Sequence, residues 1–259
     1  MAKSVIYEPK GRALEYAPLA CEVYTGCSHR CTYCFNIRSG KRTEADFYEA
    51  VRPVPNLIRD LKQVVANFRA VEGQPLKRVL LSFGCDPYQP LEEEHHLTRQ
   101  VIELFVAEDV PFTVLSKGGT RVLPDLDLIA SGKGSYAATI ILTEEKDREV
   151  WEPNAATIAD RVEALRQAHD RGITTWVSIE PPVIPDQALD VIDMVAPVVD
   201  AMKLGKWNHE EEADEIDWKD FAYRAYGRLK AVGKPYLIKH DLHPYYNKNA
   251  ILNTIPEGF

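Results

Sequence analysis

Residues 20–36 read Ala-Cys-Glu-Val-Tyr-Thr-Gly-Cys-Ser-His-Arg-Cys-Thr-Tyr-Cys-Phe-Asn, and this stretch decides the fold class. An apolar run typical of a buried strand, Ala20–Tyr24, leads directly into three cysteines with the spacing C-x3-C-x2-C. A short loop with this spacing can wrap one metal group, and thiolates are the ligands that iron–sulfur clusters prefer. Three ligands in place of four leave one iron of a [4Fe–4S] cluster open to another molecule. We therefore expect Cys27, Cys31 and Cys34 to hold a cluster with an open coordination position.

Strand and helix patterns alternate from this stretch to about residue 240. Six further apolar runs are typical of buried strands: Arg78–Phe83, Phe112–Ser116, Tyr136–Leu142, Ile173–Ile179, Ala201–Leu204 and Tyr236–Lys239. Helical patterns lie between them, with Asn56, Thr157 (with Asp160 as a capping box) and Asp217 as expected N-caps. Strands that are apolar on both faces and alternate with helices predict an α/β fold with a parallel sheet. The number of units favours a single-domain full or partial (β/α) barrel over residues 1–259, with its core at about 20–240 and its chemistry where the strands end.

Composition narrows the functional class. The 259 residues are 45% hydrophobic and 27% charged, which excludes disorder for most of the chain. The formal net charge of −8 is uneven, because residues 1–78 carry 13 Lys and Arg against 8 Asp and Glu. An acidic whole argues against generic duplex binding but allows a local basic face. No apolar run reaches the ~18 residues of a membrane span, and the first ten residues lack the apolar part of a signal peptide, so we expect a cytoplasmic protein with no membrane partner.

The cysteine motif and several later stretches together resemble the radical S-adenosylmethionine (SAM) superfamily, and within it the spore photoproduct lyase branch. These stretches are Gly84-Cys85-Asp86-Pro87-Tyr88-Gln89-Pro90, Leu97-Thr98-Arg99, Leu115-Ser116-Lys117, Leu126-Asp127-Leu128 and Trp151-Glu152-Pro153. The resemblance covers almost the whole chain and implies a partial (β/α)6 barrel of parallel strands with outer helices. It also implies a [4Fe–4S] cluster on Cys27, Cys31 and Cys34, with SAM chelated by the open iron. One electron from a flavodoxin- or ferredoxin-type donor would cleave SAM to a 5′-deoxyadenosyl radical, which abstracts a hydrogen atom from the substrate.

The resemblance further implies a set of SAM-binding residues: Tyr33, Gly84, Asp86, Ser116, Lys117, Thr139 and Glu180. Tyr33, beside the last cysteine, is expected near the adenine. Gly84 and Asp86 stand where the family often has Gly-Gly-Glu and binds the methionine amino group, and the change to Gly-Cys-Asp leaves the exact contact open. The ammonium of Lys117, after Ser116, suits the methionine carboxylate, and the hydroxyl of Thr139 suits the ribose. Local packing is the alternative role for Tyr33 and Thr139.

Two residues are candidates for catalytic roles. Glu180 ends the fifth predicted strand, and a carboxylate at a barrel mouth is costly unless it is paired, so we expect it to contact SAM or substrate. Cys85 lies two residues after Phe83, which takes the place of the hydrogen-donating cysteine of the lyase. Cys85 could still donate a hydrogen atom, and an inert buried thiol is the alternative.

A nucleobase or nucleotide in DNA or RNA, to be modified or repaired, is the expected substrate, by analogy with the lyase branch. Three segments could contact it: Arg38 with Lys41 and Arg42, Trp207-Asn208-His209, and Lys239-His240 with His243, Tyr245 and Tyr246. A small molecule or a peptide is the alternative, although peptide enzymes of this class usually carry an auxiliary cluster and only Cys21 and Cys85 are left for one. The alternative of another class is a non-catalytic zinc or iron–sulfur module, with Cys21 as the fourth thiolate of a zinc site.

Overall fold

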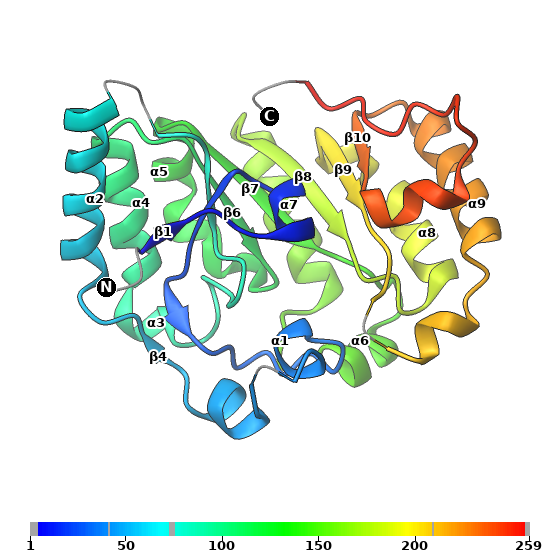
Figure 1. Cartoon of the computed structure of the whole chain (residues 1–259), viewed down its shortest axis with the longest axis horizontal. Helices are drawn as coiled ribbons and strands as arrows, with labels where there is room; N and C mark the ends of the chain where they lie inside the picture. The colour runs from blue at the N-terminus through cyan, green and yellow to red at the C-terminus, as the bar shows by residue number, and fades with distance from the viewer. Residues whose placement is uncertain (1–4, 41, 73–75, 209, 257–259) are drawn as a thin grey trace.

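One curved, mostly parallel sheet lies at the centre of the molecule (Figure 1). The computed structural model describes residues 5–40, 42–72, 76–208 and 210–256. The strands are hydrogen-bonded in the order β1-β2-β5-β6-β7-β8-β9-β10, and only β1 and β2 pair antiparallel. Their bounds are β1 Ile6–Tyr7, β2 Leu19–Cys21, β5 Val79–Leu81, β6 Phe112–Ser116, β7 Gly134–Thr139, β8 Thr174–Ile179, β9 Ala201–Leu204 and β10 Tyr236–Ile238. In the described residues no pairing joins β1 to β10, so the sheet forms a partial barrel, as predicted.

Each of the seven predicted strands overlaps an observed parallel strand. The run Tyr136–Leu142 was predicted too late in the chain, because β7 begins at Gly134 and ends at Thr139. The first prediction was too long. The run Ala20–Tyr24 divides into β2 and β3 (Tyr24–Thr25), because Glu22 and Val23 leave the sheet and β3 pairs antiparallel with β4 (Arg52–Pro53). Pairs of two-residue strands such as β3 and β4 carry too few residues for a periodic pattern.

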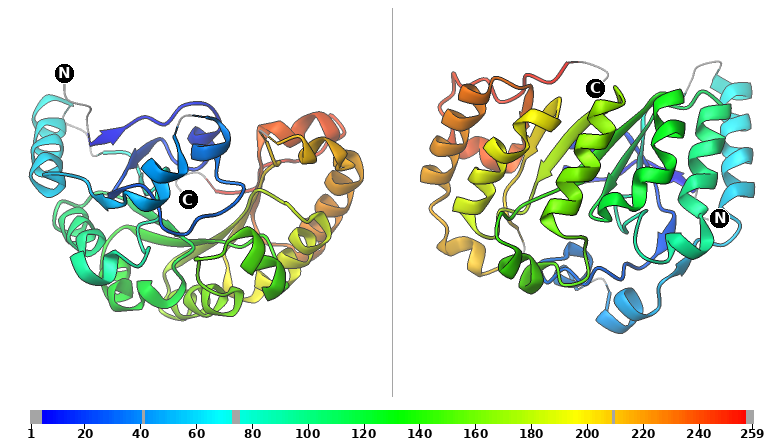
Figure 2. Two further views of the ribbon diagram at one scale, coloured as in Figure 1. Left: turned by 90° about the horizontal axis from the view of Figure 1, so that it is seen from below. Right: turned by 180° about the vertical axis from the view of Figure 1, so that it is seen from behind.

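Helices cover the convex face of the sheet, which Figure 2 shows as an arch with the helices outside it. The bounds of the helices are α1 Phe35–Arg38, α2 Leu57–Glu72, α3 Glu92–His95, α4 Leu97–Ala107, α5 Leu126–Ser131, α6 Glu145–Trp151, α7 Ile158–Asp170, α8 Pro185–Val195 and α9 Trp218–Val232. Of these, α1, α3 and α6 lie instead at the end of the sheet that bears the cysteine loop (Figure 1). Shorter helical turns are η1 Gly11–Glu15, η2 Ala45–Glu49, η3 Gly119–Asp125, η4 Ala196–Val198, η5 Glu212–Glu215 and η6 His240–Tyr245. None of the described helices combines the length and the apolar character that crossing a bilayer requires.

Of the three predicted N-caps, those at Thr157 and Asp217 are confirmed, whereas Asn56 has φ +57° and its side chain makes no cap hydrogen bond to α2 among the described residues. The Asp217 carboxylate accepts hydrogen bonds from the first backbone N–H groups of α9, at 3.0 Å. Thr157 accepts from the backbone N–H of Asp160, but the reciprocal half of the capping box was predicted wrongly. The Asp160 carboxylate bonds to Thr120 instead, and so ties α7 to the turn after β6.

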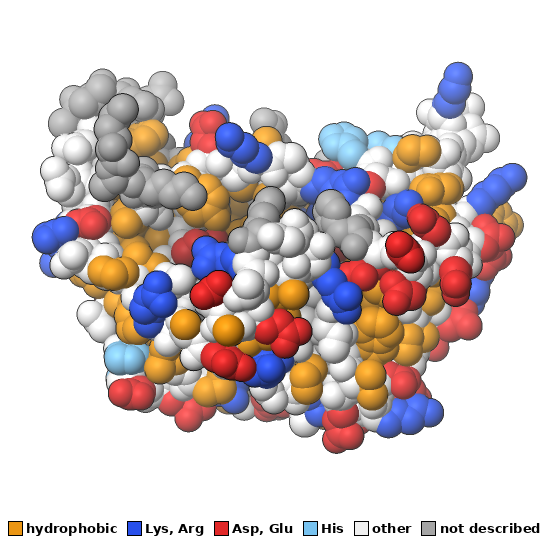
Figure 3. All heavy atoms as spheres, turned by 60° about the horizontal axis from the view of Figure 1, so that its bottom comes forward, with side chains coloured by type: hydrophobic (Ala, Val, Ile, Leu, Met, Phe, Trp, Pro, Cys, Tyr) orange, Lys and Arg blue, Asp and Glu red, His pale blue; other side chains and the backbone are white. Residues whose placement is uncertain are grey.

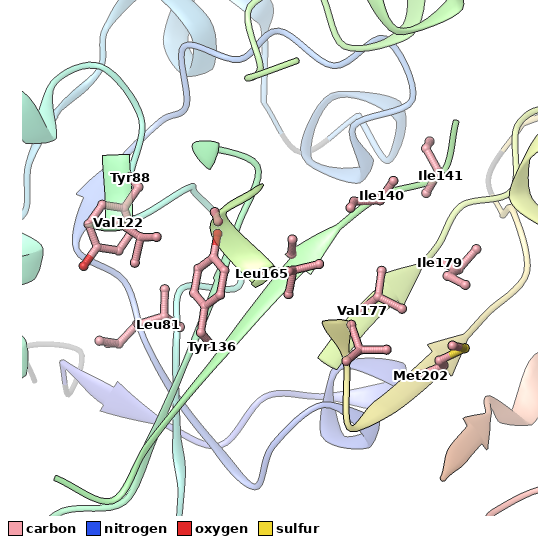
Figure 4. Close-up of a cluster of buried hydrophobic side chains, with 14 of the residues drawn as sticks. Leu81, Tyr88, Val122, Tyr136, Ile140, Ile141, Leu165, Val177, Ile179 and Met202 are labelled. Carbon is pink, nitrogen blue, oxygen red and sulfur yellow. The ribbon is translucent and has the colours of Figure 1, made fainter. Parts of the chain in front are cut away.

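Side chains alternate between the two faces of the sheet and so divide the interior in two. Toward the helices point large apolar residues from neighbouring strands, among them Leu81, Tyr136, Val177 and Met202, which Figure 4 shows in one cluster. The concave face carries small residues around Trp176. Because the inward-facing residues at the strand ends are polar, this face provides the walls of a cavity at the carboxyl ends of the strands.

Candidate active site

A cavity of about 540 Å³ lies at the carboxyl ends of the parallel strands. The cysteine loop, the segments that follow β5–β10 and the N-terminal segment around η1 line it. The residues predicted to hold the cluster, bind SAM or act in catalysis are all among the lining residues: Cys27, Cys31, Tyr33, Cys34, Gly84, Cys85, Asp86, Ser116, Lys117, Thr139 and Glu180. The structure therefore brings the predicted set together, while the role of each residue stays a prediction.

The cysteine loop is fixed by backbone contacts on two sides. On one side the N–H of Cys27 donates to the Phe47 carbonyl at 2.9 Å, and the Tyr48 hydroxyl donates to the Cys31 carbonyl at 2.8 Å. On the other side Thr32 donates its N–H to the Trp151 carbonyl at the end of α6. Gly26, just before the loop, has φ +86°, and a Cβ there would lie 2.5 Å from the Phe47 carbonyl oxygen. The approach of the loop to η2 thus requires glycine.

The three loop thiols suit a soft metal cluster. Burial, together with charge on neighbouring cysteines, raises the pKa of the Cys27 thiol well above its ordinary value, and burial raises the pKa of Cys31 to about 12. Such thiols stay protonated until a metal displaces the proton, which is how thiolate sites load. Among the described residues no three His, Cys, Asp or Glu side chains converge on a single ion, and a cluster spreads its ligands over separate irons. Cys21 is fully buried and does not line the cavity, which leaves the zinc alternative without its fourth thiolate.

Tyr33 is anchored by a buried charged network. Its hydroxyl donates to Glu152, whose other carboxylate oxygen lies 2.5 Å from the guanidinium of Arg161. Arg161 also donates to the carbonyls of Ala156 and Thr139, so the network connects the cysteine loop to the end of β7. Burial alone would raise the pKa of Glu152, but the nearby cations, chiefly Arg161, hold it below its ordinary value. Sequence reasoning found Glu152 only as part of the Trp-Glu-Pro resemblance.

The Lys117 ammonium lies beside the cysteine loop, 5.6 Å from the centre of the Tyr33 ring. Burial alone would lower its pKa, but the electrostatic interactions with Cys31 and Glu152 hold the pKa above its ordinary value. No carboxylate of the described residues comes within ion-pair distance of this ammonium. Lys117 is thus a charged cavity residue still able to pair with an anionic ligand.

The Asp86 carboxylate is occupied by its own chain. One oxygen accepts from the Ser116 hydroxyl at 2.7 Å and the Tyr88 N–H at 2.8 Å, and the other accepts from the Lys117 N–H at 2.6 Å. The ring of His29 lies 3.4 Å from this second oxygen. Burial would raise the pKa of Asp86, but His29 and these hydrogen bonds hold it well below its ordinary value. In the structure Asp86 and Ser116 shape the turn after β6, and the contact of Asp86 with the methionine amino group stays a prediction.

Glu22 shapes the segment after β5, and sequence reasoning missed it. Its carboxylate accepts from three successive backbone N–H groups, those of Phe83, Gly84 and Cys85, at 2.8 to 3.1 Å, and from the Tyr7 hydroxyl at 2.6 Å. The signal in the sequence was a single carboxylate inside the apolar run that follows Leu19. Its partner segment could not be read from the sequence, because it lies about 60 residues away.

On the β8–β10 side of the cavity, Glu180 is paired as the sequence reasoning required. One carboxylate oxygen accepts from both the Lys239 ammonium and the Tyr16 hydroxyl, each at 2.6 Å. Gly205, after β9, lies between them: a Cβ at this position would be 2.4 Å from the carboxyl carbon of Glu180. The absence of a side chain at 205 lets Glu180 reach from β8 across β9 to Lys239 after β10.

Of the three segments predicted to contact nucleic acid, two contribute to the cavity. Trp207, Asn208 and Lys239 line it, whereas His240 is exposed outside it. Tyr246 packs against Tyr226 on the far side of η6. His209 and Lys41 lie outside the described residues.

The segment after the cysteine loop makes contacts within the protein. Arg38 pairs with Glu210 at 3.0 Å, and the guanidinium of Arg42 lies 5.7 Å from the centre of the Phe47 ring. Seen from the side that bears α1, α3 and α6, basic and acidic side chains are interspersed on the surface (Figure 3). This face therefore does not resemble the broad basic surface of a duplex-binding protein.

A family model described as the Radical SAM superfamily matches residues 21–196. The chain is 28% identical over 171 residues to protein ORF301 of Acidianus two-tailed virus, a match that covers 62% of this chain and 55% of that protein. It is 29% identical over 175 residues to Rv2578c of Mycobacterium tuberculosis, covering 62% and 48%. It is 28% identical over 175 residues to a radical SAM Nalpha-GlyT isomerase of Pseudomonas phage M6, covering 63% and 33%. The chain thus spans about half the length of the first two relatives and a third of the isomerase.

Solved structures share the fold. Spore photoproduct lyase in complex with a dinucleoside spore photoproduct matches with a TM-score of 0.64 and 13% identity, over 92% of this chain and 79% of that one. Streptococcus suis SuiB bound to S-adenosylmethionine matches with a TM-score of 0.63 and 11% identity, over 90% and 52%. At these identities the matches establish a common architecture, the partial barrel described above.

Proposed function

The chain belongs to the radical SAM superfamily, whose cofactors are a [4Fe–4S] cluster and SAM, and we propose that it uses them to abstract a hydrogen atom from a nucleobase or nucleotide. The observation that carries this proposal is one cavity shared by the cysteine loop and the ends of the parallel strands. When bound, the cluster and SAM supply the 5′-deoxyadenosyl radical; the protein supplies position and a site shielded from water.

The residues of the cysteine side would bind the cofactors. We assign Cys27, Cys31 and Cys34 to three irons, which leaves the fourth for SAM. The Lys117 ammonium, which no carboxylate of the described residues neutralises, would bind the methionine carboxylate. The Thr139 side chain lines the cavity at the end of β7, where its hydroxyl would meet the ribose.

Cys85 fits the role of a hydrogen-atom donor better than that of a nucleophile. Burial and the negative charge of Glu22 raise the pKa of its thiol well above the ordinary value. The sulfur therefore keeps its hydrogen at neutral pH, as donation of a hydrogen atom to a substrate radical demands. A thiolate would lack the atom to be transferred.

The β8–β10 side supports a nucleobase or nucleotide as the substrate, because it combines cations with aromatic rings. Lys206 and Lys239 line it together with Tyr16 and Trp207, and base stacking on such rings is independent of sequence. The lyase neighbour was solved with a dinucleoside and the SuiB neighbour with a precursor peptide, so the substrate class needs a direct test. We further propose that the chain acts as one domain in the cytoplasm and receives its electron from a flavodoxin- or ferredoxin-type protein.

Anaerobic reconstitution with iron and sulfide, followed by dithionite and SAM, tests the proposal. We expect about four irons per chain, broad absorbance near 400 nm and release of 5′-deoxyadenosine. Cys31→Ala should lose both cluster and nucleoside release, while Cys21→Ala, which changes a buried thiol outside the cavity, should keep both. Stimulation of nucleoside release is then compared among oligonucleotides, free nucleotides and peptides. A protein that holds one zinc and cleaves no SAM would contradict the proposal, and stimulation by peptides alone would overturn its substrate class.

A further inference from the structure

The Glu180–Lys239 pair forms a polar floor on the β8–β10 side of the cavity. The Lys239 side chain is 3% exposed and that of Glu180 is 17% exposed. The carboxylate accepts the hydrogen bonds of Lys239 and Tyr16 on the same oxygen, Oε2. Glu180 Oε1 accepts no hydrogen bond from the described residues, and Lys239 donates one of its three hydrogens to a described acceptor.

This floor therefore presents a free acceptor beside free donors. A carboxylate oxygen and ammonium hydrogens that lack partners in a mostly buried place cost free energy, and a ligand that pairs with both removes that cost. Glu180 Oε1 and the remaining hydrogens of Lys239 together fit a ligand that presents a donor and an acceptor on one edge.

The Watson–Crick edge of every nucleobase has this chemistry, since each base places an N–H donor next to a ring nitrogen or carbonyl acceptor. Tyr16 and Phe83, whose ring centres lie 5.9 Å apart, also line this part of the cavity, and such rings stack on bases.

We propose that Glu180 and Lys239 bind the Watson–Crick edge of the substrate base, with Glu180 accepting from the base N–H and Lys239 donating to its neighbouring acceptor. The inference rests on the proposed function, in which a nucleobase is the substrate. It adds that the base must be unpaired, because pairing occupies the same edge. A free nucleotide, a single strand or a base turned out of the duplex fits this floor, and a stacked, paired base does not.

Binding to the cluster-loaded protein tests the inference. The probes are a fluorescent thymidine 12-mer, the same strand in a duplex with its adenosine complement, and a 12-mer of N3-methylthymidine, which lacks the donor of the Watson–Crick edge. We expect the single strand to bind at least about tenfold more tightly than the other two, as hydrogen bonds to charged groups allow. Equal affinity for the single strand and the duplex, or for the methylated and unmethylated strands, would overturn the inference.

A pair of double variants locates the effect. Glu180→Met with Lys239→Met removes both charges together, a replacement that buried ion pairs often tolerate without loss of folding. It should abolish the preference for the unmethylated single strand, and the dissociation constant for SAM, measured on the same preparation, shows whether the pair belongs to the SAM site instead. The matched control is Glu163→Met with Arg166→Met, an exposed pair on α7, which should change neither. If the first variant weakens SAM binding as much as strand binding, the floor belongs to the SAM site and the inference is wrong.

Nucleoside release from SAM, measured on the same preparation, distinguishes failure of the base-binding inference from failure of the proposed function. If SAM is cleaved but the protein shows no preference for the unpaired base, only the inference about Glu180 and Lys239 is refuted. If the unaltered protein cleaves no SAM, both the proposed function and this inference are refuted.

Discussion

Removing the charge of Glu152 should destabilise the protein more than any exposed ion pair could. Glu152 and Arg161 are each 1% exposed, with 2.5 Å between carboxylate oxygen and guanidinium nitrogen. Glu152→Gln keeps the volume but leaves a guanidinium buried without a counter-ion, which costs about 3–5 kcal/mol. For a chain of this size 1 kcal/mol corresponds to roughly 2–4 °C in Tm, so we expect Tm to fall by about 6–20 °C.

Thermal unfolding followed by circular dichroism measures this fall, without iron and with the cluster loaded. The control is Glu163→Gln, which breaks a pair with Arg166 on α7 in which both side chains are more than a third exposed. Exposed pairs contribute about 0–1 kcal/mol, so the control should lose no more than a few degrees. The double variant Glu152→Gln with Arg161→Met should lose less than the two single changes added together, because no unpaired charge remains buried. A Glu152→Gln protein that melts within about 2 °C of the control would refute the reasoning.

The same pair has a predicted pH dependence. The folded pKa of Glu152 lies below the unfolded value of about 4.3, so the stabilisation is fully present above that pH and is lost as the pH falls toward the folded pKa. The stability difference between the unaltered protein and Glu152→Gln should therefore shrink below about pH 4.3. Urea unfolding at pH 7 and below pH 4 checks this, and a constant difference would contradict it.

Three further predictions follow from the cavity and its surroundings. Gly205→Ala places a methyl group against Glu180 and should cost about 1–3 kcal/mol in thermal unfolding, whereas Gly227→Ala in α9, with open space around it, should be neutral or stabilising. Burial and two nearby cations lower the pKa of Lys203 from 10.5 to about 8, so between these pH values the unfolded chain binds more protons and stability rises with pH, by up to about 3 kcal/mol. Lys203→Met should remove that rise between urea unfolding at pH 8 and at pH 10, and an unchanged slope would contradict the assignment. Lys117→Met should keep the iron content and weaken SAM binding roughly tenfold or more in equilibrium dialysis; unchanged affinity would remove Lys117 from the SAM site.

Local sequence pattern was sufficient for the parallel strands and most helix caps, because each depends on residues close in the chain. Asp217 and Thr157 cap helices through neighbours two or three positions away. The reciprocal hydrogen bond of the capping box, from the Thr157 N–H to the Asp160 carboxylate, was predicted wrongly for the opposite reason. Its carboxylate, Asp160, is taken by Thr120, some 40 residues earlier, and tertiary packing decides that competition.

The location of the site was also predictable, since carboxyl ends of parallel strands meet at one edge of the sheet. The partners of the individual side chains were not. Glu22 binds the segment around Gly84, and Tyr16 binds Glu180, 164 residues further on. Such contacts depend on strand register and on the path of the N-terminal segment, which periodicity does not specify.

The two carboxylates among the described residues that line the cavity show why partners matter more than residue type. Asp86, predicted to bind the SAM ammonium, has both oxygens engaged: Oδ1 accepts two hydrogen bonds and Oδ2 accepts one beside the His29 ring. Glu180 receives both of its hydrogen bonds on one oxygen and keeps the other free in the cavity. Glu180 therefore has the freer oxygen toward the cavity, whereas the carboxylate of Asp86 mainly holds the turn after β6.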